Sequence, residues 1–185
     1  MNKLSRGMTL IELLIVVAII SITIAIATPS MSSFLTRNRI TVQLNSLAMA
    51  IKMARESAIM LNKVVTLCRS ENFDQCGGKW HQGMMLFIDQ NKDHKFNNSD
   101  TLISNFSAFP DGDVIFWRSF QNRQYIQMSP RGTTRNQNGT FTYCPKEGLG
   151  HARGIIINAA GRHRFTKDKN EDGIDEGADN RPLRC

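Results

Sequence analysis

The hydrophobic pattern begins with a long apolar run near the N-terminus. From Leu13 to Ala27 no residue is charged, and only Ser21 and Thr23 are polar. With the apolar residues just before it, the run approaches the ~20 residues that span a bilayer core. Glu12 interrupts the run, and a carboxylate at membrane depth is costly enough to indicate a function. The pattern predicts a membrane helix over residues 8–28 with a functional carboxylate near its start.

A second helical pattern follows the apolar run, over residues 29–62. Apolar residues recur there at alternating spacings of four and three, which places them on one stripe of a helix. The polar residues between them would face solvent or neighbouring subunits. The stripe comprises Ile40, Leu44, Leu47, Ile51, Ala54, Ala58 and Leu61.

Beyond residue 62 the pattern changes to short β-type runs separated by turn residues. Runs of this length and spacing are typical of antiparallel sheet, and the apolar stripe of the helix needs such a sheet to cover it. We therefore expect an α+β fold, in which a long N-terminal helix packs on a β-rich head over residues 63–185. The expected strands are 64–69, 84–89, 101–106, 114–118, 125–128, 140–144, 154–158 and 162–165.

Composition adds a limit on size and a strong charge. The chain of 185 residues suits the helix plus one domain of ordinary size. Its net charge of +7 and its pI near 9.5 favour association with an acidic polymer or a membrane surface.

Four cysteines all lie beyond the membrane helix, at Cys68, Cys76, Cys144 and Cys185. Lys3 and Arg6 precede that helix, so the positive-inside rule places the head outside the cytoplasm, where disulfides persist. Cys68 and Cys76 are close in sequence and flank an expected hairpin, so we pair them. Cys144 then bridges to Cys185.

The residues at the membrane boundary carry a specific resemblance. The sequence Gly-Met-Thr-Leu-Ile-Glu at residues 7–12, followed by an apolar helix, resembles the class III signal of type IV pilins and type II secretion pseudopilins. The resemblance implies that a prepilin peptidase cuts after Gly7 and methylates the new amine of Met8, where family members often have Phe. It also implies that Glu12 pairs with that amine on a neighbouring subunit during assembly.

Three segments of the expected hairpin narrow this resemblance. Val65–Cys68, Cys76–Trp80 and Phe87–Asn91 resemble minor pilins and pseudopilins of the FimT/FimU and GspH type. The resemblance implies a pilin-like fold and assembly with other pilin subunits through the N-terminal helix.

Positive charge is concentrated between residues 114 and 167. Glu147 is the one acid of this segment, and most of its basic residues are arginine, whose planar fork suits phosphate. A surface of this kind attracts nucleic acid independently of base sequence. The basic residues are Arg118, Arg123, Arg131, Arg135, Lys146, Arg153, Arg162, Arg164 and Lys167.

Within the basic segment, Gly161 precedes an alternating pair of arginines, Arg162 and Arg164. In a strand both would project to the same face. The segment resembles the Gly-Arg-x-Arg motif of FimT-type minor pilins, which implies DNA binding during natural transformation. The other candidate DNA-binding residues are Lys167, Arg153, Arg131 and Arg135. Alternatively, these arginines pair with acids on neighbouring pilins or keep the head soluble.

An acidic loop follows the arginines directly. Asp168, Asn170 and Asp172 stand at alternate positions before Gly173, as in a calcium loop, with Asp179 where an EF-hand carries its last ligand. A solvated loop without a metal is the simpler alternative. Unless it is folded away or neutralised by an ion, this loop would repel phosphates from the arginines.

Enzyme motifs are missing from the sequence, including a nucleophile elbow, a zinc-protease motif and a Walker loop. We therefore expect a minor type IV pilin that is not an enzyme and needs no cofactor, with calcium in the acidic loop as the open alternative. It would sit in the inner membrane with a periplasmic head, join a pilus, and bind double-stranded DNA. The alternatives are a type II secretion pseudopilin and a FimU-like subunit that primes pilus assembly, neither of which binds DNA.

Overall fold

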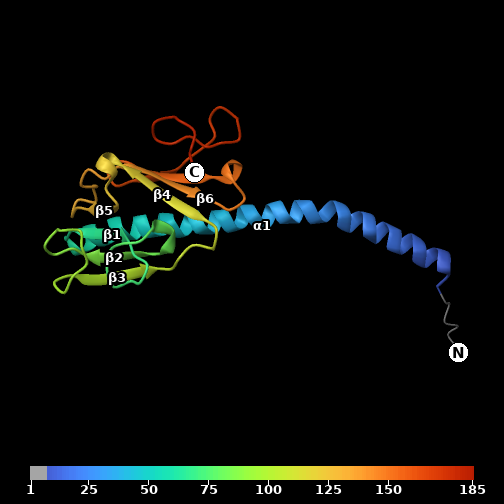
Figure 1. The fold of residues 1–185 in the computed structure, drawn as a ribbon, viewed down its shortest axis with the longest axis horizontal. Helices are drawn as coiled ribbons and strands as arrows, with labels where there is room; N and C mark the ends of the chain where they lie inside the picture. The colour runs from blue at the N-terminus through green and yellow to red at the C-terminus, as the bar shows by residue number, and fades with distance from the viewer. Residues whose placement is uncertain (1–7) are drawn as a thin grey trace. The chain divides into compact units, whose positions relative to one another are not determined.

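The computed structural model of the protein describes residues 8–185, apart from the side chains of Pro29 and Ser30. Gly7 and the rest of the leader, on which the cleavage prediction depends, lie outside the described residues. Helix α1 runs from Leu10 to Leu61 (Figure 1). The chain divides into two compact units, Met1–Ile40 and Thr41–Cys185.

The N-terminal unit is the apolar part of α1. Its most apolar window has a mean hydropathy of 2.9, and none of that window is buried in the protein. The hydroxyl of Ser21 donates to the carbonyl of Val17 at 2.8 Å, and that of Thr23 donates to the carbonyl of Ile19. Polar groups satisfied within the helix are tolerated in a bilayer. By length and composition, this helix can cross a membrane.

The second part of α1 carries the predicted apolar stripe, with one correction. The stripe is buried from Ile40 to Ala58, but Leu61 is 48% exposed. The helix ends there because Asn62 takes a left-handed conformation, with φ of 51°, and the amide of Lys63 donates to the carbonyl of Ala58 at 3.2 Å. Leu61 therefore lies beyond the last buried turn.

All eight expected strands are confirmed, each to within one residue at either end. They form two antiparallel four-stranded sheets, in the orders β3-β2-β1-β5 and β4-β6-β7-β8 (Figure 1). The first sheet contains β1 (Val65–Arg69), β2 (Met84–Ile88), β3 (Thr101–Phe106) and β5 (Tyr125–Met128). The second contains β4 (Val114–Ser119), β6 (Gly139–Cys144), β7 (Arg153–Ile157) and β8 (His163–Phe165).

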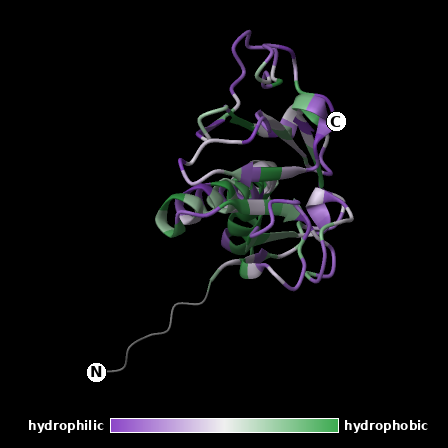
Figure 2. Ribbon diagram, turned by 90° about the vertical axis from the view of Figure 1, so that its left-hand side faces the viewer, coloured by the Kyte–Doolittle hydropathy of each residue, from purple (hydrophilic) through white to green (hydrophobic). Residues whose placement is uncertain are grey.

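The inner faces of the two sheets and the helix stripe make the core of the head. Leu67 and Ile126 of the first sheet and Phe141 and Ile155 of the second are fully buried. Trp80, in the loop between β1 and β2, meets the ring of Phe141 edge-on at 4.9 Å between centroids and so joins the two sheets. Figure 2 shows hydrophobic residues concentrated in the helix and strands, and hydrophilic residues in the surrounding loops.

The outer face of the first sheet is covered by loops. Cys68, Met85 and Phe87 are buried on this face, against Phe96 of the loop that follows β2 and Tyr125 of β5. Cys68 forms a disulfide with Cys76, as predicted. This cover explains why β1 and β2 are buried on both faces.

The outer face of the second sheet is covered by the C-terminal tail, residues 166–185, which forms the loops coloured red in Figure 1. Thr140 and Thr142 of β6 line a cavity of about 270 Å³ together with Gly177 and Pro182 of the tail. The predicted second disulfide joins Cys144, at the end of β6, to the last residue, Cys185. The tail is thus fixed at both of its ends.

The two disulfides are expected to differ in what they contribute to stability. The sequence separation is 41 for Cys144 and Cys185 and 8 for Cys68 and Cys76. In the chain-entropy model these loops correspond to a stabilisation of about 4 and about 2.5 kcal/mol, respectively. Replacing Cys144 and Cys185 together with Ala should therefore lower the free energy of unfolding more than replacing Cys68 and Cys76. Urea unfolding of the oxidised proteins measures both values, and the reverse order would contradict the prediction.

Candidate nucleic-acid interface and assembly site

Glu12 has a partner within its own chain. Its carboxylate accepts from the backbone amide of Thr9 at 3.3 Å, and its own amide donates to the hydroxyl of Thr9 at 3.3 Å. This reciprocal pair is a capping box, which satisfies free amides at the start of a helix. Glu12 therefore caps α1 in the single chain, in addition to the assembly role predicted from the sequence.

The arginine pair lies on the hairpin that joins β7 to β8. The carbonyl of Asn158 accepts from the amide of Gly161 at 2.9 Å, and the amide of Asn158 donates to the carbonyl of Arg162 at 3.0 Å. Gly161 has φ of 71°, which makes the turn available to glycine without strain. Strand β8 begins at His163, one residue later than expected. The alternation still places Arg162 and Arg164 on one face.

The hairpin tip touches a second arginine-bearing loop, residues 129–135. A Cβ added to Gly161 would lie 2.1 Å from the carbonyl oxygen of Gly132, so the two backbones are in direct contact. The amide of Thr134 donates to the carbonyl of Ala159 at 3.1 Å. On its other side this loop is held by α1, because Nε of Arg55 donates to the carbonyl of Gly132 at 3.1 Å.

Four of the predicted DNA-binding residues belong to these two contacting segments. Arg162 and Arg164 on the hairpin and Arg131 and Arg135 on the loop are all exposed. Among the residues that the structure describes, none of the four guanidinium groups has an ion-pair or hydrogen-bond partner. The fold thus brings into backbone contact two segments, far apart in sequence, that each carry an arginine pair.

The other two predicted residues are placed differently. Arg153 is half-buried, and its guanidinium lies 3.7 Å from the carboxylate of Asp175 in the tail. It also donates to the carbonyl of Ala152 at 2.7 Å, so its charge is partly used within the head. Lys167 is exposed, and its backbone pairs with that of Glu176.

The histidine between the two arginines contributes little charge near neutral pH. His163 lies on the opposite face from its neighbours, and its pKa is lowered from 6.5 by burial first and by the positive charge of Lys52 second. The hairpin therefore presents two positive charges, not three, to an anion at neutral pH.

The acidic loop has a different carboxylate set from the one expected. Asp168 and Asp172 are grouped with Glu176. Asp179 instead lies 3.8 Å from the guanidinium of Arg181 and accepts from its backbone amide. A similar group forms in the loop after β2, from Asp89, Asp93 and Asp100.

Comparison with known proteins gives the family. Residues 43–161 match the family described as Type II transport protein GspH, and residues 2–28 match the Prokaryotic N-terminal methylation motif. The chain belongs to the GspH family. Members of this family are pilin-like subunits and not enzymes, and the methylation motif implies processing by a prepilin peptidase and assembly with other pilins.

The fold of this GspH-family chain is similar to that of a solved minor pilin. The Pseudomonas aeruginosa type IV minor pilin FimU, in one crystal form, gives a TM-score of 0.57 at 14% identity over 72% of this chain and 92% of FimU. A second crystal form gives 0.52 at 14% identity over 66% and 89%. At this identity the likeness concerns the fold alone.

Curated relatives match a shorter part of the chain. Two Pseudomonas aeruginosa proteins, each named Fimbrial protein, are 44% identical over 63 residues, or 34% of this chain. The match spans 40% of the length of these relatives.

Sequence reasoning missed three features of this region. The capping box could have been read from Thr9 and Glu12, which have the required spacing. The pairing of Arg153 with Asp175, and the contact between the hairpin and the loop 129–135, had no local signal because each joins segments through the tertiary fold.

Stability should fall as pH is lowered through the range in which histidines titrate. His81 also has a lowered pKa, by burial first and by Lys79 second. Above the unfolded value of 6.5 both histidines are neutral in either state. Below it the unfolded chain takes up protons that the folded chain does not, so the free energy of unfolding decreases.

Urea unfolding above and below this value measures the decrease in the free energy of unfolding. His163→Gln should make this decrease in the free energy of unfolding smaller. Lys52→Gln should have the same effect to a lesser degree, because the charge of Lys52 is the smaller of the two causes that lower the pKa of His163. An unchanged decrease in His163→Gln would show that other groups produce it.

Proposed function

We propose that this chain is a minor type IV pilin that binds double-stranded DNA, without sequence specificity, during natural transformation. The observation that carries the proposal is the backbone contact at Gly161 and Gly132 between two segments that each carry an exposed arginine pair, Arg162 with Arg164 and Arg131 with Arg135. Their guanidinium groups are not used by carboxylates elsewhere in the described part of the head.

The chemistry of the four arginines fits the phosphate backbone. Each guanidinium can bind a phosphate through two parallel hydrogen bonds, and each such pairing releases counterions from the duplex. Backbone contacts position a protein on DNA but carry no base information. Such a surface would hold incoming DNA of any sequence.

The assembly pathway follows from the N-terminal segment. In this proposal the precursor crosses the inner membrane once through the apolar part of α1, with its head in the periplasm. A prepilin peptidase cuts after Gly7 and methylates Met8. Glu12 then pairs with the amine of a neighbouring subunit as the chain enters the pilus, where the head becomes extracellular.

A second candidate function shares everything except DNA. The description of the matched family names a type II transport protein, and the fold is similar to that of FimU. These observations favour a secretion pseudopilin, or a subunit that primes pilus assembly as proposed above for a FimU-like chain. In either case the arginines would serve contacts between subunits.

The arginine pair gives the direct test of DNA binding. Arg162→Gln with Arg164→Gln should weaken binding of a duplex of mixed sequence by the full chain in detergent. It should also lower the dependence of log K on log salt by roughly one for each phosphate that the variant no longer binds. The head should stay folded, because exposed substitutions usually change stability by less than about 0.5 kcal/mol. Fluorescence anisotropy over a range of salt measures the affinity and its salt dependence.

A charge-matched control separates the site from the net charge. Lys92→Gln with Lys95→Gln removes the same charge from exposed positions on the loop after β2, and it should leave most of the affinity. In cells, the arginine double variant should lose transformation but keep pili. Unchanged DNA binding by that variant, or loss of pili, would favour the second candidate function.

Two substitutions near the N-terminus separate helix capping from charge at Glu12. Glu12→Gln keeps a side chain that can complete the capping box but removes the charge, so it should insert normally and assemble poorly. Thr9→Ala removes the hydroxyl of the box but keeps the charge, so it should assemble at near-normal levels. The measurement is the amount of this subunit in sheared pili relative to membranes; equal defects in both variants would indicate that capping alone matters. Mass spectrometry of the same material should show N-methylated Met8.

A further inference from the structure

The C-terminal tail contains a turn whose structure is repeated elsewhere in the head. In the tail, the amide of Gly173 donates to Asp168, that of Asp172 to Asn170, and that of Ile174 to Asp172, at 2.7, 3.2 and 2.8 Å. In the loop after β2 the amides of His94, Asp93 and Lys95 donate to Asp89, Asn91 and Asp93 in the same order, at 3.0, 3.2 and 2.8 Å. The two turns therefore present side-chain oxygens in the same arrangement.

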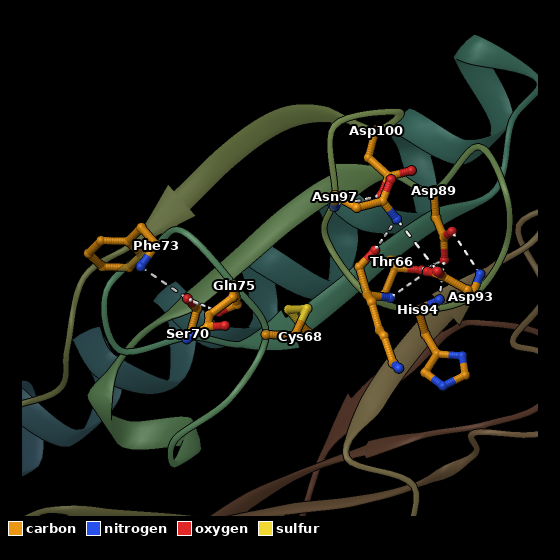
Figure 3. Close-up of a disulfide and its surroundings, with 12 residues drawn as sticks. Thr66, Cys68, Ser70, Phe73, Gln75, Asp89, Asp93, His94, Asn97 and Asp100 are labelled. Atoms are coloured by element: carbon orange, nitrogen blue, oxygen red, sulfur yellow. Dashed lines mark hydrogen bonds between the residues drawn. A yellow bond between two sulfur atoms is a disulfide. The ribbon is translucent and has the colours of Figure 1, made fainter.

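Each turn contributes to a group of three carboxylates with one buried member, Asp89 in the loop after β2 and Glu176 in the tail, and the two buried members differ in whether the protein itself satisfies them. Asp89 is 1% exposed, and its two oxygens accept from Thr66, Gln127 and two backbone amides. Figure 3 shows Asp89 together with Thr66, Asp93 and His94. Glu176 in the tail is 5% exposed. Its Oε2 accepts from the amide of Lys169 at 2.8 Å, but its Oε1 is buried without a hydrogen-bond partner among the described residues.

A buried carboxylate oxygen without a hydrogen-bond partner lowers the stability of the folded state. The groups around Glu176 indicate what kind of partner its Oε1 would bind. One carboxylate oxygen from each of Asp168, Asp172 and Glu176 lies within 4.8 Å of the others. Calcium binds oxygen at 2.3–2.6 Å, so two of its ligands lie at most about 5 Å apart. A hydrogen-bond donor could satisfy Oε1 alone, whereas a cation satisfies all three groups and offsets their mutual repulsion.

We propose that the tail binds a calcium ion through Asp168, Asp172 and Glu176, with the amide oxygen of Asn170 as a further ligand. Glu176 takes the place that the sequence pattern gave to Asp179. Asp175 is not a ligand, since it accepts from the hydroxyl of Thr166 at 2.6 Å and pairs with Arg153. The site lies beyond residues 43–161, the part of the chain that matches the family, and it is independent of DNA binding.

A bound calcium ion would stabilise the C-terminal tail where it covers the outer face of the second sheet. Glu176 pairs through its backbone with both Lys167 and Pro182, so it lies where the tail crosses back over itself. An ion held by Glu176 and the turn at Asp168–Asp172 would fix this crossing. For a head outside the cytoplasm we expect the affinity range of extracellular calcium modules, about 10⁻⁴–10⁻³ M.

The test is titration of calcium chloride into the chelator-treated full chain in a nonionic detergent, by calorimetry, with magnesium chloride in parallel. We expect calcium binding in the range above and weaker magnesium binding, because magnesium demands a more rigid octahedron. Hydrogen exchange read by mass spectrometry should show calcium-dependent protection of peptides from residues 166–183, and none in residues 89–100. Absence of calcium heat and of protection would overturn the proposal, as would equal magnesium binding.

Charge-matched variants locate the site. Glu176→Gln and, as a second and exposed position, Asp172→Asn should each weaken calcium binding by about tenfold or more, at least as much as the loss of an outer-shell partner does. Glu171→Gln removes the same charge from an exposed position in the same loop and should leave calcium affinity unchanged. Asp93→Asn makes the equivalent change in the other turn and should also leave it unchanged. Loss of binding in Asp93→Asn with retention in both ligand variants, or equal weakening by Glu171→Gln, would contradict the assignment.

Discussion

The folded state of the head depends on burying both faces of two four-stranded sheets, using only one helix, short loops and the C-terminal tail. The inner faces are buried on the apolar stripe of α1 and on each other, which leaves two outer faces that still carry Met85, Phe87 and Ile156. If these apolar side chains were exposed to water, the folded state would lose the free energy that their burial contributes. The first outer face is closed by two loops: the loop after β1 is held by the Cys68–Cys76 disulfide, and the loop after β2 contains the Asp89–Asp93 turn. The second is closed by the tail, which carries both the Cys144–Cys185 disulfide and the Asp168–Asp172 turn.

This arrangement determines where charged side chains can be presented. The outer face of the second sheet is covered by the tail, which is tied to β7 by the ion pair between Asp175 and Arg153. The hairpin tip and the loop 129–135 lie at the end of the sheet and are supported by backbone contacts between Gly132 and Gly161. Because backbone contacts hold these two segments in place, the arginine side chains make no contact within the described part of the chain that the local structure needs, and they are available to bind a partner.

The sequence predicted the elements well and their tertiary relations only in part. Periodicity identified the helix and all the strands because buried strands such as Met84–Ile88 form continuous apolar runs bounded by turn residues. Spacing also paired the cysteines correctly. Leu61 was expected on the buried stripe but is exposed, since periodicity gives the spacing of the stripe and not which of its turns the sheets cover. The grouping of Glu176, and not Asp179, with Asp168 and Asp172, and the pairing of Arg153 with Asp175, depend on how the tail folds back, which no local pattern encodes.

The bond between Cys144 and Cys185 also determines how the head would respond if a subunit assembled through its helix were pulled. It encloses 41 residues, a contour length of roughly 140 Å if fully extended, which includes the arginine hairpin and the whole tail. Force entering the head through α1 can unravel the chain outside this enclosed length but cannot lengthen the enclosed part. A stretched subunit would therefore keep its hairpin and tail joined to the end of β6 while other parts of the head extend.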